Sequence, residues 1–85
     1  MDRDSVWQAM IVAVREETGD PDAVVEPAMT ANDIPGWDSL AHVRIVMNME
    51  ARAGAVIEMS DTYKAATVGD LCDIVLKNIK AAAAG

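Results

Sequence analysis

The sequence predicts an all-α fold: a small four-helix bundle with three long helices, one short helix, and a long loop between helices one and two. Three segments carry apolar residues at helical spacing, and no segment shows the sustained alternation of a β-strand. The chain has 85 residues, the length of one small domain. We therefore expect a single domain over residues 1–85, with an ordered core at about 4–80 and a flexible tail at 81–85.

The first helix is predicted to run from Ser5 to about Thr18. Ser5 and Gln8 have the spacing of a capping box. Gly19 can adopt the left-handed conformation that ends a helix, and Pro21 prevents continuation. The apolar positions of this helix are Val6, Trp7, Met10, Ile11 and Val14.

A long connection is predicted over Asp20 to Asp38. It holds all three prolines of the chain and shows no sustained period. At about twenty residues it is longer than most loops in compact domains, so we expect either hidden local structure or a functional role. Val24, Val25 and Met29 are expected to hold part of it against the core.

Two helices and one short helical turn follow this loop. The second helix is predicted to begin near Ser39 and to end at Gly54, with an apolar stripe of Leu40, Val43, Ile45, Val46, Met47 and Met49. A single turn is expected at Ser60 to Tyr63. The capping-box pattern Thr67 to Asp70 then opens a last helix that should finish near Lys80. Its predicted inward residues are Val68, Leu71, Ile74, Val75 and Ile79.

Composition excludes several classes of function. The formal net charge is -7, which argues against nucleic-acid binding, because that binding depends on Lys and Arg neutralising phosphates. Basic protein surfaces are the more plausible partners. Cys72 is the only cysteine and His42 the only histidine, so no ligand set is spaced for a metal site. No apolar stretch approaches the roughly 18 residues of a membrane span, and we expect a cytoplasmic monomer without membrane insertion.

The sequence offers little to support catalysis. Ser39 and His42 lie three residues apart, which would place them on neighbouring positions of a helix. An 85-residue bundle has little room for a pocket or for a third orienting group, so we assign no catalytic residue. We expect His42 on the surface of the first helical turn. Ser39 itself has an ordinary structural interpretation, because Asp and Ser are preferred helix N-caps.

The stretch from Asp33 to Leu40, Asp-Ile-Pro-Gly-Trp-Asp-Ser-Leu, resembles the acyl carrier protein family, and the resemblance spans roughly Val6 to Ile79. In that family the serine of Asp-Ser-Leu receives a 4'-phosphopantetheine from coenzyme A, which implies that role for Ser39. The arm's thiol then holds acyl groups as thioesters. The resemblance implies a non-catalytic carrier served by a phosphopantetheinyl transferase, an acyl-loading ligase or acyltransferase, and the synthase or transferase enzymes of a pathway.

The resemblance also implies that the second helix and the loop after it form the partner-binding face. The residues implicated are Asp38, Leu40, Val43, Arg44, Met47, Ile57 and Met59. An apolar cargo would shelter between the helices near Val46, Met47, Met59, Ala65 and Leu71.

The chain departs from fatty-acid carriers, because Arg44 and Arg52 stand on a helix that is strongly acidic in those proteins. We therefore expect a discrete carrier in polyketide, specialised or fatty-acid-like biosynthesis. Two alternatives stay open. One is a peptidyl or aminoacyl carrier, whose usual motif has Gly-Gly-His-Ser or Gly-Gly-Asp-Ser; the other is a helical interaction module that is never modified and in which Ser39 is only a cap.

Overall fold

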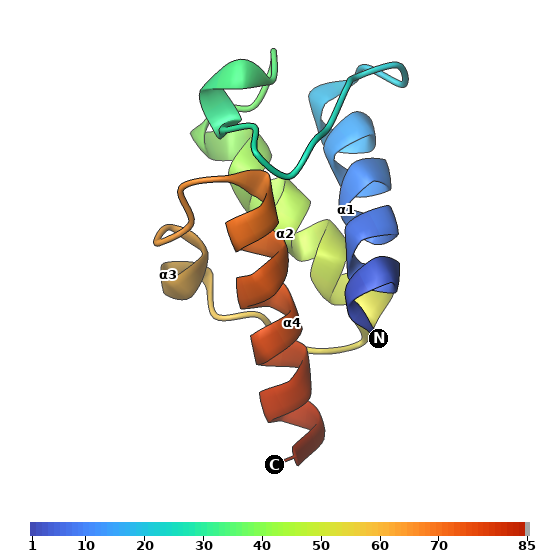
Figure 1. The fold of residues 1–85 in the computed structure, drawn as a ribbon, viewed down its shortest axis with the longest axis vertical. Helices are drawn as coiled ribbons and strands as arrows, with labels where there is room; N and C mark the ends of the chain where they lie inside the picture. Colours follow the sequence, from blue (N-terminus) through green and yellow to red (C-terminus); the bar gives the residue numbers. More distant parts are fainter. Residues whose placement is uncertain (85) are drawn as a thin grey trace.

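The computed structural model describes residues 1–84 and shows four α-helices and one short 3-10 helix (Figure 1). The helices are α1 (Arg3–Thr18), α2 (Ser39–Ala53), α3 (Met59–Thr62) and α4 (Val68–Ala84), and the 3-10 helix η1 covers Ala31–Asp33. No strand occurs in the described part of the chain. The predicted all-α fold, with three long helices and one short one, is confirmed.

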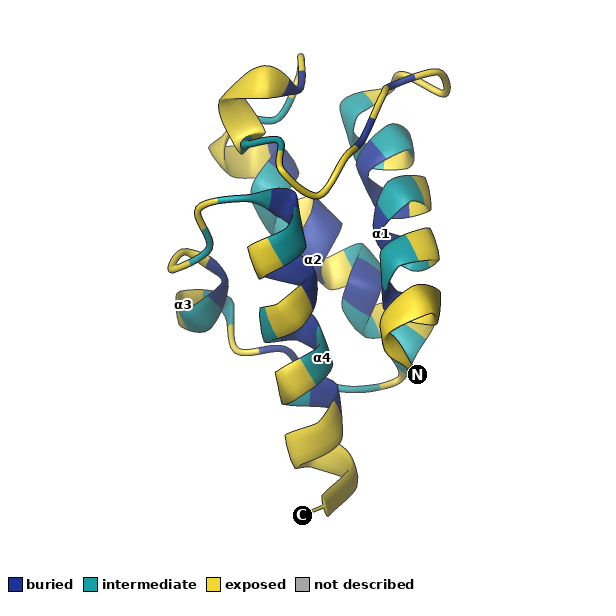
Figure 2. Cartoon of the chain, viewed as in Figure 1, coloured by how far each residue is buried: buried dark blue, intermediate teal, exposed yellow. Residues whose placement is uncertain are grey.

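The core lies where the three long helices face one another. Helix α1 packs against both α2 and α4, and the short α3 packs against α2 and α4. In Figure 2 the buried residues form a stripe along the inner side of each long helix, while the outer sides are exposed. The fully buried large side chains include Val6, Met10, Val14, Ile45, Val46, Met49, Val68 and Val75. The predicted apolar periods mark the inner faces of α1 and α4. In α2 the inner face carries Ile45, Val46 and Met49, whereas Leu40 and Met47 of the predicted stripe are exposed.

Helix α1 begins earlier than the sequence suggested. Its N-cap is Asp2, whose carboxylate accepts a hydrogen bond from the Ser5 backbone N–H at 2.8 Å. The predicted capping box of Ser5 and Gln8 is therefore wrong, because Ser5 already lies inside the first turn. The other end is as predicted: Gly19 adopts a left-handed conformation (φ 75°) and its N–H donates to the Arg15 carbonyl.

The long loop contains hidden local structure and is tied to the bundle. Besides η1, its backbone carbonyls at Pro27 and Met29 accept hydrogen bonds from Gly69 and Val68 at 2.9 and 2.8 Å. These two N–H groups lie in the first turn of α4, where a helix has no internal acceptors for them. The loop thus completes the N-terminus of α4.

The apolar residues of the loop divide between the core and the solvent. Val25 is buried and Met29 is half-buried, as expected, but Val24 is 65% exposed, so its predicted anchoring role is wrong. Ala23 and Ile34 are buried in its place. In extended chain neighbouring side chains point to opposite sides, so Val24 and Val25 could not both face inward.

The predicted start of helix α4 is confirmed, whereas its predicted end near Lys80 is wrong. Thr67 and Asp70 form the reciprocal hydrogen bonds of a capping box, at 3.1 and 3.3 Å. The helix continues to Ala84 instead of finishing near Lys80, since a run of alanines has the highest helix propensity. Residues 81–84 are exposed. Flexibility of the tail stays a prediction, and Gly85 lies outside the described residues.

Candidate functional site

The candidate site is the junction where the long loop enters α2. Asp38 is the N-cap of α2: its backbone is extended (φ -108°, ψ -173°) and its carboxylate accepts from the Ala41 N–H at 2.8 Å. Ser39 is the first helical residue and is exposed. The interpretation of Ser39 as the cap is therefore wrong, because the preceding aspartate already does that work. The Ser39 side chain is left at the surface, at the positive end of the helix dipole.

Gly36 shapes the approach of the loop to this junction. Its φ is +87°, a conformation that L-residues rarely adopt. A Cβ atom at Gly36 would lie 3.3 Å from both the Cβ and the carbonyl oxygen of Thr18. The loop therefore passes close to the end of α1 just before it delivers Asp38 and Ser39 to the start of α2.

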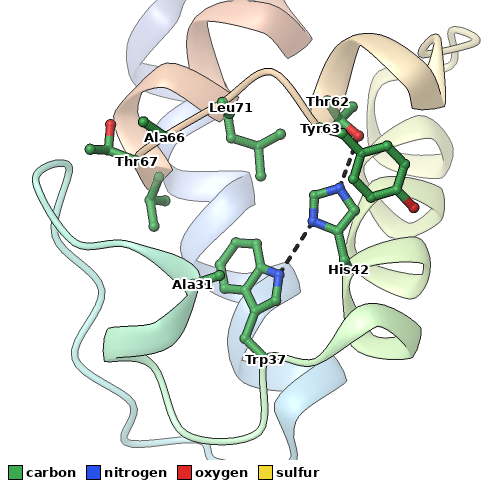
Figure 3. A pocket seen from close by; sticks show the side chains of 10 residues that line it. Ala31, Trp37, His42, Thr62, Tyr63, Ala66, Thr67 and Leu71 are labelled. Carbon is green, nitrogen blue, oxygen red and sulfur yellow. Dashed lines mark hydrogen bonds between the residues drawn. The ribbon is translucent and has the colours of Figure 1, made fainter.

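His42 does not serve Ser39 as a base. Its Nδ1 accepts a hydrogen bond from Trp37 Nε1 at 3.3 Å, and its Nε2 lies 2.9 Å from Thr62 Oγ1 (Figure 3). Both ring nitrogens are thus engaged by other groups. The expected surface position is also wrong, because the ring is half-buried between α2 and α3. Burial lowers the pKa of His42, which favours the neutral ring.

We call Trp37, His42, Thr62 and Tyr63 the His42 cluster. The Tyr63 ring stacks on the imidazole, with ring centroids 4.7 Å apart and 25° between the planes. Sequence reasoning missed this cluster. Its members at 37 and 42 lie on either side of the α2 cap, while those at 62 and 63 are twenty residues further on, so no local spacing signals the contact.

A cavity of about 200 Å³ lies beside the His42 cluster, between the loop and α4 (Figure 3). It is lined by Ala31, Trp37, His42, Thr62, Tyr63, Ala65, Ala66, Thr67, Val68 and Leu71. Of the five residues expected to shelter cargo, Ala65 and Leu71 line this cavity. Val46 is buried in the core, whereas Met47 is 57% exposed on the outside of α2.

The outer side of α2 presents part of the predicted partner-binding face. Leu40 and Met47 are each 57% exposed, Arg44 is exposed, and Val43 is half-buried. Ile57 is only 3% exposed and packs in the core, so its side chain is not on this face. Met59 is half-buried against the core. A partner protein can therefore contact Leu40, Met47 and Arg44 directly.

The charged side chains of α2 are Arg44, Glu50 and Arg52, and the last two are engaged within the protein. Glu50 accepts from the Ile57 N–H at 2.8 Å, and Arg52 pairs with Glu16 of α1. Hydrogen bonds from Asn48 and Arg52 lower the pKa of Glu16. Arg44 has no ion-pair partner within residues 1–84. Arg44 therefore contributes an exposed positive charge beside Leu40 and Met47.

No group of three or more His, Cys, Asp or Glu side chains in residues 1–84 could hold a metal ion. None of the helices in that range is long and apolar enough to cross a membrane. Cys72 is buried, and burial raises the pKa of its thiol to about 12.

Comparison with known proteins gives two similarities that cover most of the chain. No family model matches it. The acyl carrier protein of Thermotoga maritima is 31% identical over 78 residues, which are 91% of this chain and 95% of that protein. The solution NMR structure of holo acyl carrier protein from Geobacter metallireducens superposes with a TM-score of 0.74 at 30% identity, covering 87% of this chain and 85% of that one.

Proposed function

Because the chain belongs to the acyl carrier protein family, we propose that Ser39 bears a 4'-phosphopantetheine arm on which acyl intermediates are carried as thioesters. The observation that carries this proposal is the position of Ser39: exposed, first in α2, and not needed as the cap. The similar Geobacter protein was solved in its holo form, which supports a prosthetic group here.

The junction fits a phosphodiester in several respects. The first N–H groups of a helix lack internal acceptors, and the positive end of the dipole favours an anion. Asp38 occupies the Ala41 N–H, while the N–H groups of Ser39 and Leu40 donate no hydrogen bond within residues 1–84. The arm, when attached, supplies the thiol that forms the thioester. The surrounding residues hold the attachment point and need no chemistry of their own.

Attachment requires outside catalysis. The Ser39 oxygen would form a bond to the β-phosphorus of coenzyme A, the pyrophosphate bond would break, and 3',5'-ADP would leave. With both of its nitrogens engaged, His42 cannot accept the proton of Ser39. A phosphopantetheinyl transferase and its metal would therefore remove it. This supports a non-catalytic carrier.

The partners proposed are that transferase, an acyl-loading ligase or acyltransferase, and the synthase or transferase enzymes of one pathway. Their docking face would comprise Leu40, Arg44 and Met47, with Asp38 and the half-buried Val43 and Met59 at its edges. A face with an exposed Arg44 would be attracted less strongly to basic enzyme surfaces than an acidic one. This favours a discrete carrier with dedicated partners in polyketide, specialised or fatty-acid-like biosynthesis. A cytoplasmic monomer remains our expectation.

The test is the intact mass of the protein after incubation with a broad-specificity phosphopantetheinyl transferase, coenzyme A and magnesium. We expect the gain of one phosphopantetheine, and no gain in Ser39→Ala. An unmodified wild-type protein, under conditions that modify a control carrier, would contradict the proposal and favour the interaction module. Loading the modified protein with acyl against aminoacyl donors would then separate an acyl carrier from a peptidyl carrier.

A further inference from the structure

From the contacts around His42 we infer that this residue positions the Ser39 junction for modification, by linking Trp37 of the loop to Thr62 of α3 in one hydrogen-bonded chain. The inference rests on the proposed function of Ser39. It assigns His42 no contact with the transferred group: the residue would act through Trp37, which lies two positions before Ser39. Three elements of the fold meet at its ring (Figure 3).

The hydrogen-bond partners of His42 determine the protonation state of its imidazole ring. An indole N–H can only donate, so His42 Nδ1 must accept from Trp37. The Thr62 hydroxyl donates to the Met59 carbonyl at 2.6 Å, so its oxygen must accept from His42 Nε2–H at 2.9 Å. Only the neutral Nε2–H tautomer satisfies both contacts. A protonated imidazole carries hydrogen on both nitrogens and would lose the bond from Trp37.

The junction depends on Trp37 for its position. The half-buried indole of Trp37 packs against the hydrophobic core. The backbone N–H of Trp37 donates to the carbonyl of the buried Ile34 at 3.2 Å. Asp38, the cap of α2, follows directly. The orientation of the residues around Ser39 therefore follows from where the Trp37 side chain is held, and His42 holds its polar edge.

At the other end of this hydrogen-bonded series, His42 contacts α3 through Thr62. This helix has four residues, and its N-cap Glu58 makes no side-chain capping bond within the described residues. So short a helix is not stable by itself. Thr62, which is 1% exposed, and Tyr63 connect it to the His42 ring by a hydrogen bond and a stacking contact. Loss of the His42 contacts would loosen α3 and the loop together.

Among residues 1–84, most charged groups on the elements around His42 bind other partners, while the exposed Arg44 of α2 has no ion-pair partner. Tyr63 is the titratable group that touches its ring. Asp61 pairs with Lys64 at 3.2 Å, and Asp33, Asp38 and Asp70 accept hydrogen bonds from backbone N–H groups. Burial is the cause of the lowered pKa of His42. Acidification should therefore break the bond from Trp37 without a replacement.

The test compares kcat/KM for phosphopantetheine transfer to the wild type and to His42→Phe between pH 5.5 and 8. Phenylalanine keeps the stacking surface and removes both hydrogen bonds. At pH 7.5 and above we expect the variant to be about tenfold slower, mainly through a lowered kcat, because a misplaced reacting group reduces rate steeply. The ratio of wild type to variant should fall towards one as His42 is protonated. Taking the ratio at each pH removes the transferase's own pH dependence.

Two further variants serve as support and control. Trp37→Phe removes the indole donor from the other side and should give the same loss, whereas Trp7→Phe, at a half-buried tryptophan of α1, should leave transfer unchanged. Circular dichroism at each pH checks that the variants are folded. Equal kcat/KM values for wild type, His42→Phe and Trp37→Phe across the pH range would overturn the inference.

A spectroscopic measurement tests the cluster independently of modification. In ¹⁵N NMR of Ser39→Ala, the Trp37 indole N–H resonance should shift with the same midpoint as the His42 ring protons. A Trp37 indole resonance that does not shift as His42 titrates would refute the hydrogen bond between Trp37 and His42. If the wild type accepts no arm at all, the proposed function fails and the positioning role with it, while this titration still shows whether the cluster exists.

Discussion

Asp38 and Ser39 are adjacent but should respond to substitution in opposite ways. The structure gives Asp38 the capping contact with the Ala41 N–H and leaves the Ser39 side chain exposed. Asp38→Ala should therefore reduce the free energy of unfolding, while Ser39→Ala should leave it almost unchanged. For attachment of the arm the order reverses, because only Ser39 offers the hydroxyl.

The size of the effect follows from the two contributions of Asp38. Loss of an N-cap side chain costs about 1 kcal/mol, and loss of a negative charge at a helix N-terminus costs roughly 0.3–1 kcal/mol more. Asp38→Ala should thus be destabilising by about 1–2 kcal/mol. Asp38→Asn keeps the accepting oxygen and should cost at most about 1 kcal/mol. Ser39→Ala should lie within about 0.5 kcal/mol of wild type, since alanine is the better helix former.

Urea unfolding followed by circular dichroism measures these differences. With a slope of about 1 kcal/mol/M for so small a domain, Asp38→Ala should lower the midpoint by roughly 1–2 M. The mass assay should still show one phosphopantetheine on folded Asp38→Asn and none on Ser39→Ala. The reasoning would be refuted if Ser39→Ala lost as much stability as Asp38→Ala, since the serine would then be the true cap.

Three further predictions concern the surroundings of the site. Burial raises the pKa of Cys72 from 9.0 to about 12, so iodoacetamide at pH 8 should alkylate the folded protein on the order of a hundredfold or more slower than the unfolded chain; equal rates would show an exposed thiol. Gly36→Ala should destabilise by about 1–2 kcal/mol in thermal unfolding, because its φ is +87° and its new Cβ would crowd Thr18; an unchanged Tm would contradict that backbone conformation. Burial lowers the pKa of His42 below 6.5, so the unfolded chain binds the proton first. Stability from the neutral ring should be present above pH 6.5 and lost below it, and His42→Phe should show a smaller loss between pH 7.5 and 5.5; identical losses would argue against burial of the ring.

Much of the fold can be predicted from the sequence because its signals are local. The apolar periods of the three long helices, the left-handed glycine at Gly19 and the Thr67 capping box each depend on residues within about one turn of one another. The same is true of Ser39, whose place at the loop–helix junction is set by its immediate neighbours. Local sequence therefore predicted the bundle and the place of Ser39 at the junction, while the attachment role was implied by the family resemblance.

Tertiary structure decided which side chains meet. Nothing local indicates that Ile57 is buried while Leu40 and Met47 stay exposed, because burial depends on how α2 packs against α1 and α3, and α3 against α4. Nor does spacing reveal that the loop carbonyls complete the first turn of α4.

The His42 cluster shows the same limit most clearly. The contact between His42 and Thr62 joins residues twenty positions apart, and it forms only when the loop, α2 and α3 converge. By itself the sequence determined the helices and the serine, since hydrogen bonding within a turn and apolar periodicity are properties of neighbouring residues. The hydrogen-bonded surroundings of that serine were decided by packing, because packing alone brings distant side chains within bonding distance.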